Sequence, residues 1–244
     1  MKELTLSIVV PAYNEEKIIK DNLRKIISYL RMKKYGWEIV VADDGSTDKT
    51  ASLVKSEIDK DKRVRLVRLK KNKGKGGALK EGILTARGKY IIFMDADLSV
   101  DLENIDIFLK ELKKDTSVVI ASRRVKGAKI EVHQPWHRET MGRVFTLLTR
   151  ILMKVNISDF TCGFKGFTKE SAKKIFSASL INRWAYDAEI LFLADKFGYK
   201  IKQMPIIWKN RNETRVRLKR VIFETFRDLF KIRLNDFNKA YDKG

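Results

Sequence analysis

Cysteine is almost absent from this sequence, and proline is scarce. Of the 244 residues, one is cysteine (Cys162) and three are proline. A single cysteine excludes a disulfide within the chain and a cysteine-based zinc site, and it fits a reducing compartment. No window holds about 18 consecutive apolar residues, which argues against a membrane-spanning helix but leaves attachment to a membrane surface open.

Acidic residues are in the minority. The chain has 52 Lys and Arg against 31 Asp and Glu, which gives a formal net charge of +21 at pH 7. This charge predicts an anionic partner: a nucleotide, a nucleic acid or an acidic membrane surface. The sequence shows no basic stretch, apolar core and cleavage site in order, so we expect no signal peptide and a cytoplasmic protein.

Short apolar runs alternate with helical patterns through the first half of the chain. This alternation predicts an α/β fold with a mainly parallel sheet. We expect strands at Leu6–Pro11, Glu38–Ala42, Val64–Arg68, Tyr90–Met94 and Val118–Ala121. We expect helices at Glu15–Leu30, Thr47–Ile58, Lys75–Ala86 and Leu102–Leu112.

Polar motifs follow four of these strands. They are Pro-Ala-Tyr-Asn-Glu from Pro11, Asp-Asp-Gly-Ser-Thr-Asp from Asp43, Lys-Gly-Lys-Gly-Gly from Lys73 and Asp-Ala-Asp from Asp95. Parallel sheets bind ligands beyond the carboxyl ends of their strands. Two acidic motifs and a lysine-glycine loop are therefore expected to meet at one edge of the sheet.

The carboxylates of Asp95 and Asp97 are separated by one residue, just past an apolar strand. Hard divalent cations prefer oxygen ligands, so Mg²⁺ or Mn²⁺ would bridge this pair to a diphosphate. An isolated Asp-x-Asp is more often a solvated turn, but the neighbouring loops favour the metal site here. We expect Asp97 to be catalytic through the metal and Asp95 to bind both metal and donor.

The other motifs favour a nucleotide. Asp43 or Asp44 can accept a hydrogen bond from a base N–H or a ribose hydroxyl, although this turn could simply begin a helix capped by Ser46 or Thr47. The loop around Lys75 resembles a phosphate cradle but lacks both the P-loop spacing and the dinucleotide-binding spacing. ATPase and dinucleotide oxidoreductase functions therefore lose most of their support.

These segments together resemble glycosyltransferase family 2. The resemblance rests on Ser-Ile-Val-Val-Pro-Ala-Tyr-Asn-Glu-Glu, Val-Ala-Asp-Asp-Gly-Ser-Thr-Asp-Lys-Thr, Gly-Lys-Gly-Gly-Ala and Phe-Met-Asp-Ala-Asp-Leu. Later segments, Ile-Ala-Ser-Arg-Arg, Ser-Asp-Phe-Thr-Cys-Gly-Phe-Lys-Gly-Phe and Arg-Trp-Ala-Tyr-Asp-Ala-Glu-Ile-Leu, are similar to the polyprenyl-phosphate branch. Within that branch they look more like the dolichyl-phosphate β-glucosyltransferases than like the mannose synthases.

The resemblance implies a single GT-A type domain over residues 1–210, with a nucleotide-sugar half at about 1–100 and an acceptor half at about 101–210. It implies inverting transfer of glucose or mannose from UDP-glucose or GDP-mannose to a polyprenyl or dolichyl phosphate. Pro11, Tyr13, Glu15 and Asp43 match the family's nucleoside positions, and Asp95 and Asp97 match its metal pair. We add Asp44 and Lys75 to the donor-binding set.

Four arginines of the acceptor half are candidates to hold the acceptor phosphate. Arg123 and Arg124 follow the fifth strand, and Arg138 and Arg143 lie in a helical segment. Guanidinium groups suit phosphate oxygens, although any one of these arginines is as readily a solvated surface residue. A phosphate monoester is already anionic and needs little help from a general base, so we expect Arg123 to act by holding the acceptor in line.

Three residues further along are expected at the sugar: Trp184, Asp187 and Glu189. Asp187 would be catalytic, unless it is only the N-terminal cap of a helix over Ala188–Phe197. Trp184 would stack on the sugar, although packing is the commoner fate of aromatic residues. Cys162 is expected in the core, because no histidine motif accompanies it as it would a nucleophile.

Two amphipathic segments are candidates for a membrane interface. Met141–Ile157 reads as a helix with a wide apolar face, and Arg215–Arg233, within a basic C-terminal segment at 211–244, mixes basic and apolar residues. Contact with anionic lipid or with a partner is favoured over packing for the tail, whereas packing on the domain is an equal alternative for the helix. We expect a peripheral protein on the cytoplasmic face of a membrane.

Two other functions fit part of the sequence. A family 2 enzyme with a non-lipid acceptor, such as a polysaccharide or protein glycan, would usually need a carboxylate base near the acceptor hydroxyl. A nucleic-acid-binding protein would explain the charge, but carboxylates at the ends of two strands would repel phosphates unless a metal bridged them. We therefore expect no nucleic acid.

Overall fold

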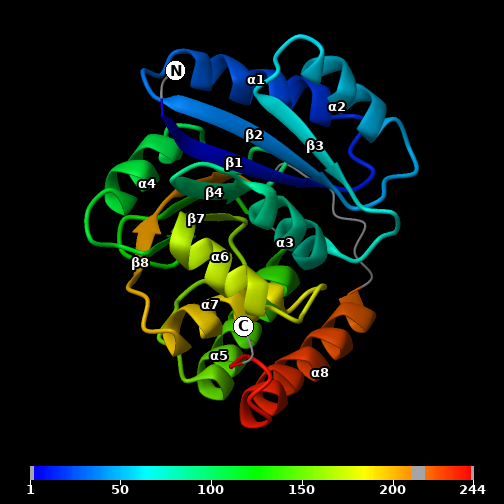
Figure 1. Cartoon of the computed structure of the whole chain (residues 1–244). Coiled ribbons are helices and arrows are strands. Elements are labelled where there is room, and N and C mark those ends of the chain that lie inside the picture. Colours follow the sequence, from blue (N-terminus) through cyan, green and yellow to red (C-terminus); the bar gives the residue numbers. More distant parts are fainter. Residues whose placement is uncertain (1–2, 134, 210–217, 243–244) are drawn as a thin grey trace.

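The computed structural model describes residues 3–133, 135–209 and 218–242, without the side chains of residues 137, 138 and 218–223. Figure 1 shows strands and helices alternating around one central sheet. The strands are β1 (Leu4–Ala12), β2 (Gly36–Asp43), β3 (Val64–Arg68), β4 (Tyr90–Met94), β5 (Val118–Ser122), β6 (Lys129–Val132), β7 (Phe164–Thr168), β8 (Ile201–Pro205) and β9 (Ile207–Lys209). The helices are α1 (Ile19–Arg31), α2 (Thr50–Ile58), α3 (Lys75–Thr85), α4 (Asn104–Leu112), α5 (Trp136–Met153), α6 (Lys169–Ala178), α7 (Tyr186–Lys196) and α8 (Leu218–Phe237).

The central sheet has the strand order β3-β2-β1-β4-β7-β5-β8. Its pairs are parallel except for those of β7, which runs antiparallel to both β4 and β5. β6 and β9 pair separately as a two-stranded ribbon. Because the chain winds outward in one direction from β1 and in the other from β4, the loops at the carboxyl ends of these strands border a crevice. The predicted polar motifs lie at this edge.

Apolar side chains cover both faces of the sheet. Along β1, Ile8 and Val10 belong to one core and Val9 to the other, as the alternation of a strand requires. Residues of α1 and α4 fill the first core, and residues of α3, α6 and α7 fill the second. Helix α1 forms because Ile19, Leu23, Ile26, Ile27 and Leu30 recur at intervals of three or four residues on its buried side.

The C-terminal helix packs on the second half of the chain. Leu229 and Ile232 of α8 are fully buried, and Tyr241 beyond it is 2% exposed. The helix lies against α5 and α7, so the described part of the basic tail contributes to the core. The expected boundary between the domain and the tail, near residue 210, lies outside the described residues.

The predicted α/β fold is confirmed, with differences at the ends of elements. Strands Val64–Arg68 and Tyr90–Met94 are confirmed to the residue. The first two strands begin two residues earlier and end one residue later than expected, and the fifth ends one residue later. The helix expected at Met141–Ile157 is displaced, because α5 begins directly after Pro135 and ends where Lys154 takes a left-handed conformation with φ of 56°. Among the described residues, none of the helices is long and apolar enough to span a bilayer.

Candidate active site

The loop after β1 carries the three residues expected at the nucleoside. Pro11 is the last residue but one of β1, and Tyr13 and Glu15 follow the strand. The N–H of Asn14 donates to Ser46 Oγ at 3.0 Å, which ties this loop to the one after β2. The Tyr13 side chain is left 44% exposed at the edge of the sheet, where a flat ligand could lie against it.

The two aspartates after β2 have different partners. The oxygens of Asp44 accept the backbone N–H groups of Lys73 and the next residue, at 2.7 and 2.8 Å. Asp43 accepts the Ser46 N–H through Oδ1 at 3.0 Å. Its buried Oδ2 accepts no hydrogen bond from the described residues, although Arg68 Nε lies 3.1 Å away. Asp44 therefore shapes the lysine-glycine loop, whereas Asp43 keeps one buried oxygen for a ligand.

The lysine-glycine loop opens α3 and faces the Asp-Ala-Asp motif. Gly74 has φ of +100°, and a side chain there would meet the Asn182 carbonyl oxygen at 2.6 Å. The N–H of Gly77 donates to the same oxygen at 3.1 Å. Lys75 Nζ lies 2.5 Å from Asp95 Oδ1. Burial opposes the charge of Lys75, but the negative charge of Asp95 outweighs it and raises the pKa of the ammonium group.

Asp95 and Asp97 follow β4 as predicted. A side chain at Gly163 would collide with the Asp95 carboxylate, so the glycine lets the two segments approach. Asp97 accepts the Ser99 N–H at 2.9 Å, and burial together with the charge of Asp95 raises the pKa of Asp97. The described residues hold no group of three or more His, Cys, Asp and Glu side chains placed for a metal ion. Two carboxylates fit a hard cation whose remaining ligands come from phosphate and water.

Asp187 is bound to a buried lysine that the sequence analysis missed. Lys165 on β7 is fully buried, and its Nζ lies 2.5 Å from Asp187 Oδ1 and donates to the Cys162 carbonyl oxygen at 2.7 Å. Asp187 lies in the first turn of α7, whose N-cap is Ala185, so it is not the helix cap. A lysine inside the strand Phe-Lys-Gly-Phe-Thr was the available signal, since a buried lysine requires an anionic partner.

Cys162 is a core residue. Its side chain is 1% exposed, and burial raises the pKa of the thiol to about 12. The thiolate is the reactive form of cysteine, and such a shift suppresses it near neutral pH. Its contribution near the site is the backbone carbonyl that holds Lys165.

The other two residues expected at the sugar, Trp184 and Glu189, differ in their surroundings: one is exposed and the other is buried. Trp184 is 44% exposed in the loop before α7. Glu189 is fully buried and accepts the N–H groups of Leu180 and Ile181, at 3.0 and 2.8 Å, and the Tyr241 hydroxyl at 2.7 Å. The carboxylate of Glu189 therefore anchors the C-terminal segment within the core. The structure does not support the expectation that Glu189 contacts the sugar.

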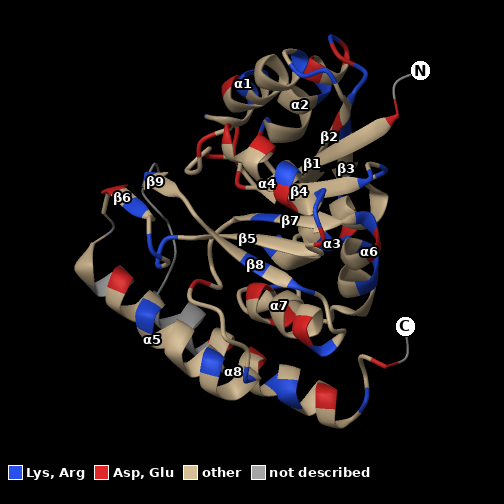
Figure 2. Cartoon of the chain, turned by 90° about the vertical axis from the view of Figure 1, so that its left-hand side faces the viewer, with Lys and Arg blue, Asp and Glu red and all other residues tan. Residues whose placement is uncertain are grey.

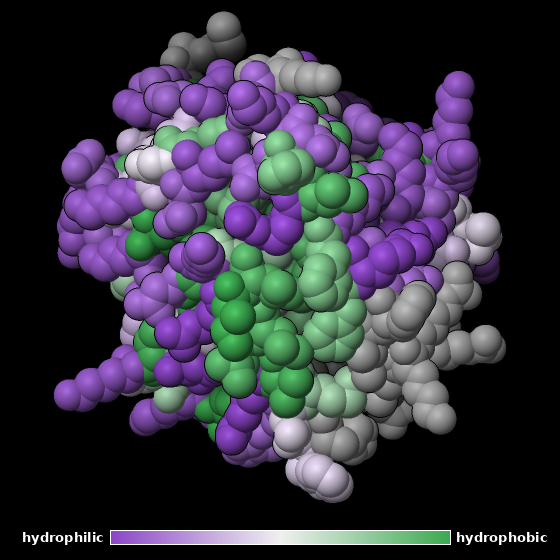
Figure 3. Space-filling model, turned by 90° about the horizontal axis from the view of Figure 1, so that it is seen from below, coloured by the Kyte–Doolittle hydropathy of each residue, from purple (hydrophilic) through white to green (hydrophobic). Residues whose placement is uncertain are grey.

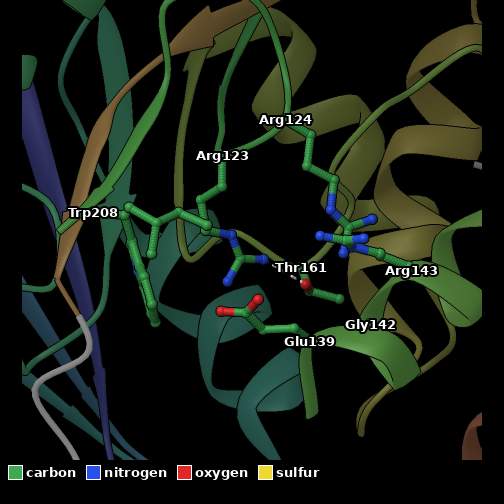
Figure 4. A pocket seen from close by; sticks show the side chains of 8 residues that line it. Arg123, Arg124, Glu139, Gly142, Arg143, Thr161 and Trp208 are labelled. Carbon is green, nitrogen blue, oxygen red and sulfur yellow. Dashed lines mark hydrogen bonds between the residues drawn. The ribbon is translucent and has the colours of Figure 1, made fainter. Parts of the chain in front are cut away.

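A cavity of about 390 Å³ lies beside the end of β5. Figure 4 shows the guanidinium groups of Arg123, Arg124 and Arg143 turned toward the same space, with the Glu139 carboxylate facing them and the Trp208 ring as one wall. The cavity is lined by Arg123, Arg124, Ile130, Glu139, Gly142, Arg143, Thr161 and Trp208. Three of the four arginines expected at the acceptor phosphate meet here, and the side chain of the fourth, Arg138, lies outside the described residues.

Arg123 is held by a buried carboxylate. Its Nε and Nη2 donate to the two oxygens of Asp159 at 2.7 and 2.8 Å, and Nη2 also donates to Thr161 Oγ1 at 2.9 Å. Burial opposes the ionisation of Asp159, but the hydrogen bonds and charge of Arg123 outweigh it and lower the pKa of the carboxyl to about 2. Among the described residues Nη1 makes no hydrogen bond, so one edge of the guanidinium group remains for the cavity.

Positive charge is concentrated around Arg124. Its Nη1 donates to Thr146 Oγ1 at 2.6 Å. Burial, and the charges of Arg123 and Arg143, lower the pKa of the Arg124 guanidinium group. A bound anion would relieve this repulsion. Glu139 supplies one negative charge, and His133 Nδ1 lies 2.8 Å from its carboxylate.

The cavity and the carboxylate pair are neighbours. Trp208 lines the arginine cavity and also a small gap that reaches Asp95 and Gly163. The Arg123 guanidinium carbon lies 5.2 Å from the centre of the Trp208 ring. Trp208 therefore stands between the two charged regions, at a position that sequence reasoning did not single out.

Helix α5 also carries an apolar stripe on its outer side. Figures 1 and 2 show α5 and α8 along the same side of the molecule, away from α1, and Figure 3 views that side as a green band bordered by hydrophilic side chains. We call this band the apolar stripe. Its most exposed residues are Val144, Leu147 and Ile151 of α5 and Phe230, Leu234 and Phe237 of α8, which are 48% to 84% exposed.

Comparison with known proteins identifies the family of the chain. Residues 7–176 match Glycosyl transferase family 2. The chain is 39% identical over 215 residues to a dolichyl-phosphate β-glucosyltransferase of Dictyostelium discoideum, covering 83% of this chain and 66% of that protein, just under two thirds of its length. It is 34% identical over 238 residues to one of Trichomonas vaginalis, covering 93% and 72%.

The solved structures support the fold. The glucosyl-3-phosphoglycerate synthase of Mycobacterium tuberculosis, in complex with Mn²⁺, UDP-glucose and phosphoglyceric acid, superposes with a TM-score of 0.64 at 21% identity. The match covers 95% of this chain and 79% of that one. The GT-A type fold expected from the motifs is confirmed, and the chain belongs to glycosyl transferase family 2.

Proposed function

We propose that the chain transfers glucose, with inversion, from UDP-glucose to dolichyl or another polyprenyl phosphate at a membrane surface. One observation carries this proposal: the arginine cavity and the apolar stripe are built on the same helix. On α5, Glu139 and Arg143 line the cavity, while Val144 and Leu147 are exposed on the stripe. An acceptor with an anionic head and a hydrocarbon tail fits both features at once.

The donor is assigned to the edge formed by β1, β2 and β4. The buried Oδ2 of Asp43 accepts no hydrogen bond from the described residues, although Arg68 forms an ion pair with it, and a base or ribose donor would satisfy it. This favours Asp43 over Asp44 for the nucleoside. Tyr13 offers an exposed ring beside it. The relatives named as glucosyltransferases and the UDP-glucose in the structural neighbour favour UDP-glucose over GDP-mannose.

A divalent cation, Mg²⁺ or Mn²⁺, fits the carboxylates of Asp95 and Asp97. When bound there it would neutralise charge on the leaving diphosphate. Asp97 would hold it from a partly buried position, and Lys75 stands beside Asp95 as a second cation. The Mn²⁺ complex of the structural neighbour supports a metal of this class.

The acceptor phosphate is assigned to the arginine cavity. A phosphate oxygen bonds to the anomeric carbon, the bond from that carbon to the diphosphate oxygen breaks, and UDP leaves with the electron pair. No proton needs to be removed from a phosphate that is already ionised, so the arginines act by placing the acceptor. Arg123, fixed by Asp159, and Arg143 would grip the oxygens from two sides.

The apolar stripe is assigned to the bilayer surface. Arg150 and Lys231 are exposed on the same two helices, and exposed Lys154 directly follows α5. The carboxylates of α8 nearby are engaged, since Asp228 pairs with Arg227 and Asp236 with a lysine and an arginine. Arg150, Lys154 and Lys231 form no ion pair with the described residues, and such cations suit the anionic lipids of the cytoplasmic leaflet, where each basic residue contributes about 1 kcal/mol. The arrangement supports peripheral binding on the cytoplasmic face.

A product assay tests the reaction. The full chain is given UDP-glucose or GDP-mannose, each with polyprenyl phosphate, phosphoglycerate or a free sugar, in the presence of Mn²⁺. We expect the glucosyl lipid phosphate as the main product. Mannosyl lipid from GDP-mannose alone would overturn the donor assignment, and transfer to phosphoglycerate or a free sugar but not to the lipid would overturn the acceptor assignment.

Vesicle flotation tests the membrane surface. Truncating the tail before Arg215 would also remove Tyr241 from the core, so point variants are the sharper tool. The double variant Leu147→Glu and Phe230→Glu should reduce binding to anionic vesicles at least tenfold and leave UDP affinity unchanged. The double variant Met32→Glu and Ile107→Glu is the matched control, because it places the same two charges on exposed residues at the end of α1 and on α4. Equal vesicle binding by the test variant and the control would overturn the assignment of the apolar stripe to the bilayer surface.

A further inference from the structure

We propose that Lys75 is an exchangeable counter-ion: it neutralises Asp95 while the donor site is empty and moves to the diphosphate when a divalent cation takes the carboxylates. This inference rests on the proposed metal-bridged donor site. It starts from the ion pair between Lys75 Nζ and Asp95 Oδ1, 2.5 Å apart, at the position where the metal would bind. A lysine and a metal cannot share that oxygen without strong repulsion.

The backbone around Lys75 is fixed, whereas its side chain can move. Asp44 holds the N–H groups of Lys73 and the next residue, and Asn182 holds the N–H of Gly77. Lys75 is the first residue of α3, so a movement of its ammonium group requires only rotations of its four-carbon side chain. The side chain is 38% exposed, which leaves space for that rotation.

The balance of charge determines where the ammonium group goes. Before the donor arrives, Asp95 and Asp97 carry two negative charges side by side, and Lys75 offsets one of them. A divalent cation would offset both, so Lys75 would lose its counter-ion. The diphosphate brings new negative charge to the same place, and the N-terminal end of α3 already favours anions there.

Another carboxylate whose charge acts on Lys75, that of Asp187, is already neutralised. Asp187 is paired with the fully buried Lys165 at 2.5 Å, so it offers Lys75 a weaker second partner. The Tyr186 ring, whose centre lies 6.0 Å from Lys75 Nζ, lines the path of the side chain without supplying a negative charge to hold it. The diphosphate is therefore the destination that the surroundings favour.

Binding measurements on Lys75→Met test the exchange, because the proposal predicts changes of opposite sign. Removing the competing cation should tighten binding of Mn²⁺ alone, measured by the EPR signal of free Mn²⁺, on the order of tenfold. Removing the partner of the diphosphate should weaken binding of UDP at saturating Mn²⁺, measured by calorimetry, also on the order of tenfold. A merely structural role for Lys75 would weaken both.

Three further variants complete the experiment. Lys75→Gln, which keeps a polar side chain, should reproduce both changes if Lys75→Met fails to fold. Lys73→Met, two residues earlier in the same loop and paired with Glu81, is the matched control and should alter neither affinity. Asp97→Asn identifies the metal site and should abolish tight Mn²⁺ binding.

The outcomes separate the inference from the proposed function. If Asp97→Asn weakens Mn²⁺ binding but neither Lys75 variant tightens it, the exchange is overturned and the metal site stands. If the Lys75 variants tighten Mn²⁺ binding but leave UDP affinity unchanged, the transfer to the diphosphate is overturned. If Asp97→Asn does not affect Mn²⁺ binding, both the metal site and the exchange are overturned.

Discussion

The donor edge and the arginine cavity present opposite charges, although both are assigned to phosphates. The donor edge carries the carboxylates of Asp95 and Asp97, whereas the cavity carries three guanidinium groups. Carboxylates hold a diphosphate only through cations, but arginines hold a phosphate directly. We therefore expect donor binding to depend on a metal, and the affinity for the acceptor to depend on the arginines.

The two regions also differ in how they are assembled. Apart from Lys75, which begins α3, each donor residue lies within a few positions of the end of a strand, so its place follows from the sheet. The cavity combines Arg123 after β5, Arg143 from α5, Thr161 from the loop before β7 and Trp208 from β9. A change in the cavity is thus expected to affect folding as well as binding.

The largest effect is expected at the donor edge. Asp97→Ala should lower the rate of transfer by about 10² or more, because charge on the leaving diphosphate loses its counter-ion. The melting temperature should not fall, since Asp97 is not part of the apolar core. Asp115→Ala, at a fully exposed carboxylate, is the control. Near-normal turnover of Asp97→Ala, or full activity in EDTA, would show that the donor half does not use a metal.

The next largest effect is expected on stability at the cavity. Arg123→Ala leaves the fully buried carboxylate of Asp159 without its partner, which should lower the free energy of unfolding by about 3–5 kcal/mol in urea. Arg123→Ala is therefore a poor test of acceptor binding alone. An unchanged unfolding midpoint would show that water reaches Asp159 and that Arg123 serves only the ligand.

The same pair gives a dependence of stability on pH. Arg123 lowers the pKa of Asp159 in the folded chain to about 2, below its value in the unfolded chain. The pair therefore stabilises the fold above pH 4, and this contribution, on the order of 2 kcal/mol, is lost as the pH falls from about 4 to about 2. Urea unfolding across that range should show a steeper loss than in Asp159→Asn, which has no carboxyl to protonate there.

A smaller effect is expected at the mouth of the cavity. Arg143→Ala should raise the KM for polyprenyl phosphate about tenfold and leave kcat and UDP affinity nearly unchanged, since a charge-assisted hydrogen bond contributes about 1.5 kcal/mol. Arg87→Ala is the matched control for kinetics, because this exposed arginine precedes β4 and so lies at the amino end of the strands, opposite the site. Loss of UDP affinity in Arg143→Ala would extend the donor site into the cavity.

The first half of the fold could be predicted from sequence because its signals are local. The apolar run Tyr90–Met94 and the motif after it specify both a buried strand and the carboxylates at its end. The position of β7 in the sheet could not be predicted from the sequence. This strand lies between β4 and β5 but follows both in the chain, and only long-range pairing determines that order.

The site residues divide in the same way, into those with a local sequence signal and those placed by long-range contacts. Asp187 and Glu189 could not both face one ligand, because residues two apart on a helix point in different directions, and the structure turns Glu189 into the core. Lys165, Asp159 and Trp208 were missed because each acts through a partner far away in the sequence. The arginines could be predicted from their residue type, but the ion pair between Arg123 and Asp159 could be recognised only in the folded structure.

The smallest effect is expected on the stability of the donor edge. Burial and Asp95 raise the pKa of Asp97 above its value in the unfolded chain. Ionising this carboxylate therefore lowers stability: the cost appears as the pH rises above the unfolded pKa, is complete above the folded pKa, and is absent when both states are protonated. Asp97→Asn should therefore raise the melting temperature slightly at pH 7 and not at pH 3. Mn²⁺ should raise the melting temperature of the natural chain and not that of the variant. The arginine cavity should show no such response, because its buried carboxylate, Asp159, is paired with Arg123 and has a lowered pKa. A lower melting temperature for Asp97→Asn at pH 7 would mean that Asp97 is a structural residue, and the contrast between the two halves of the site would lose its basis.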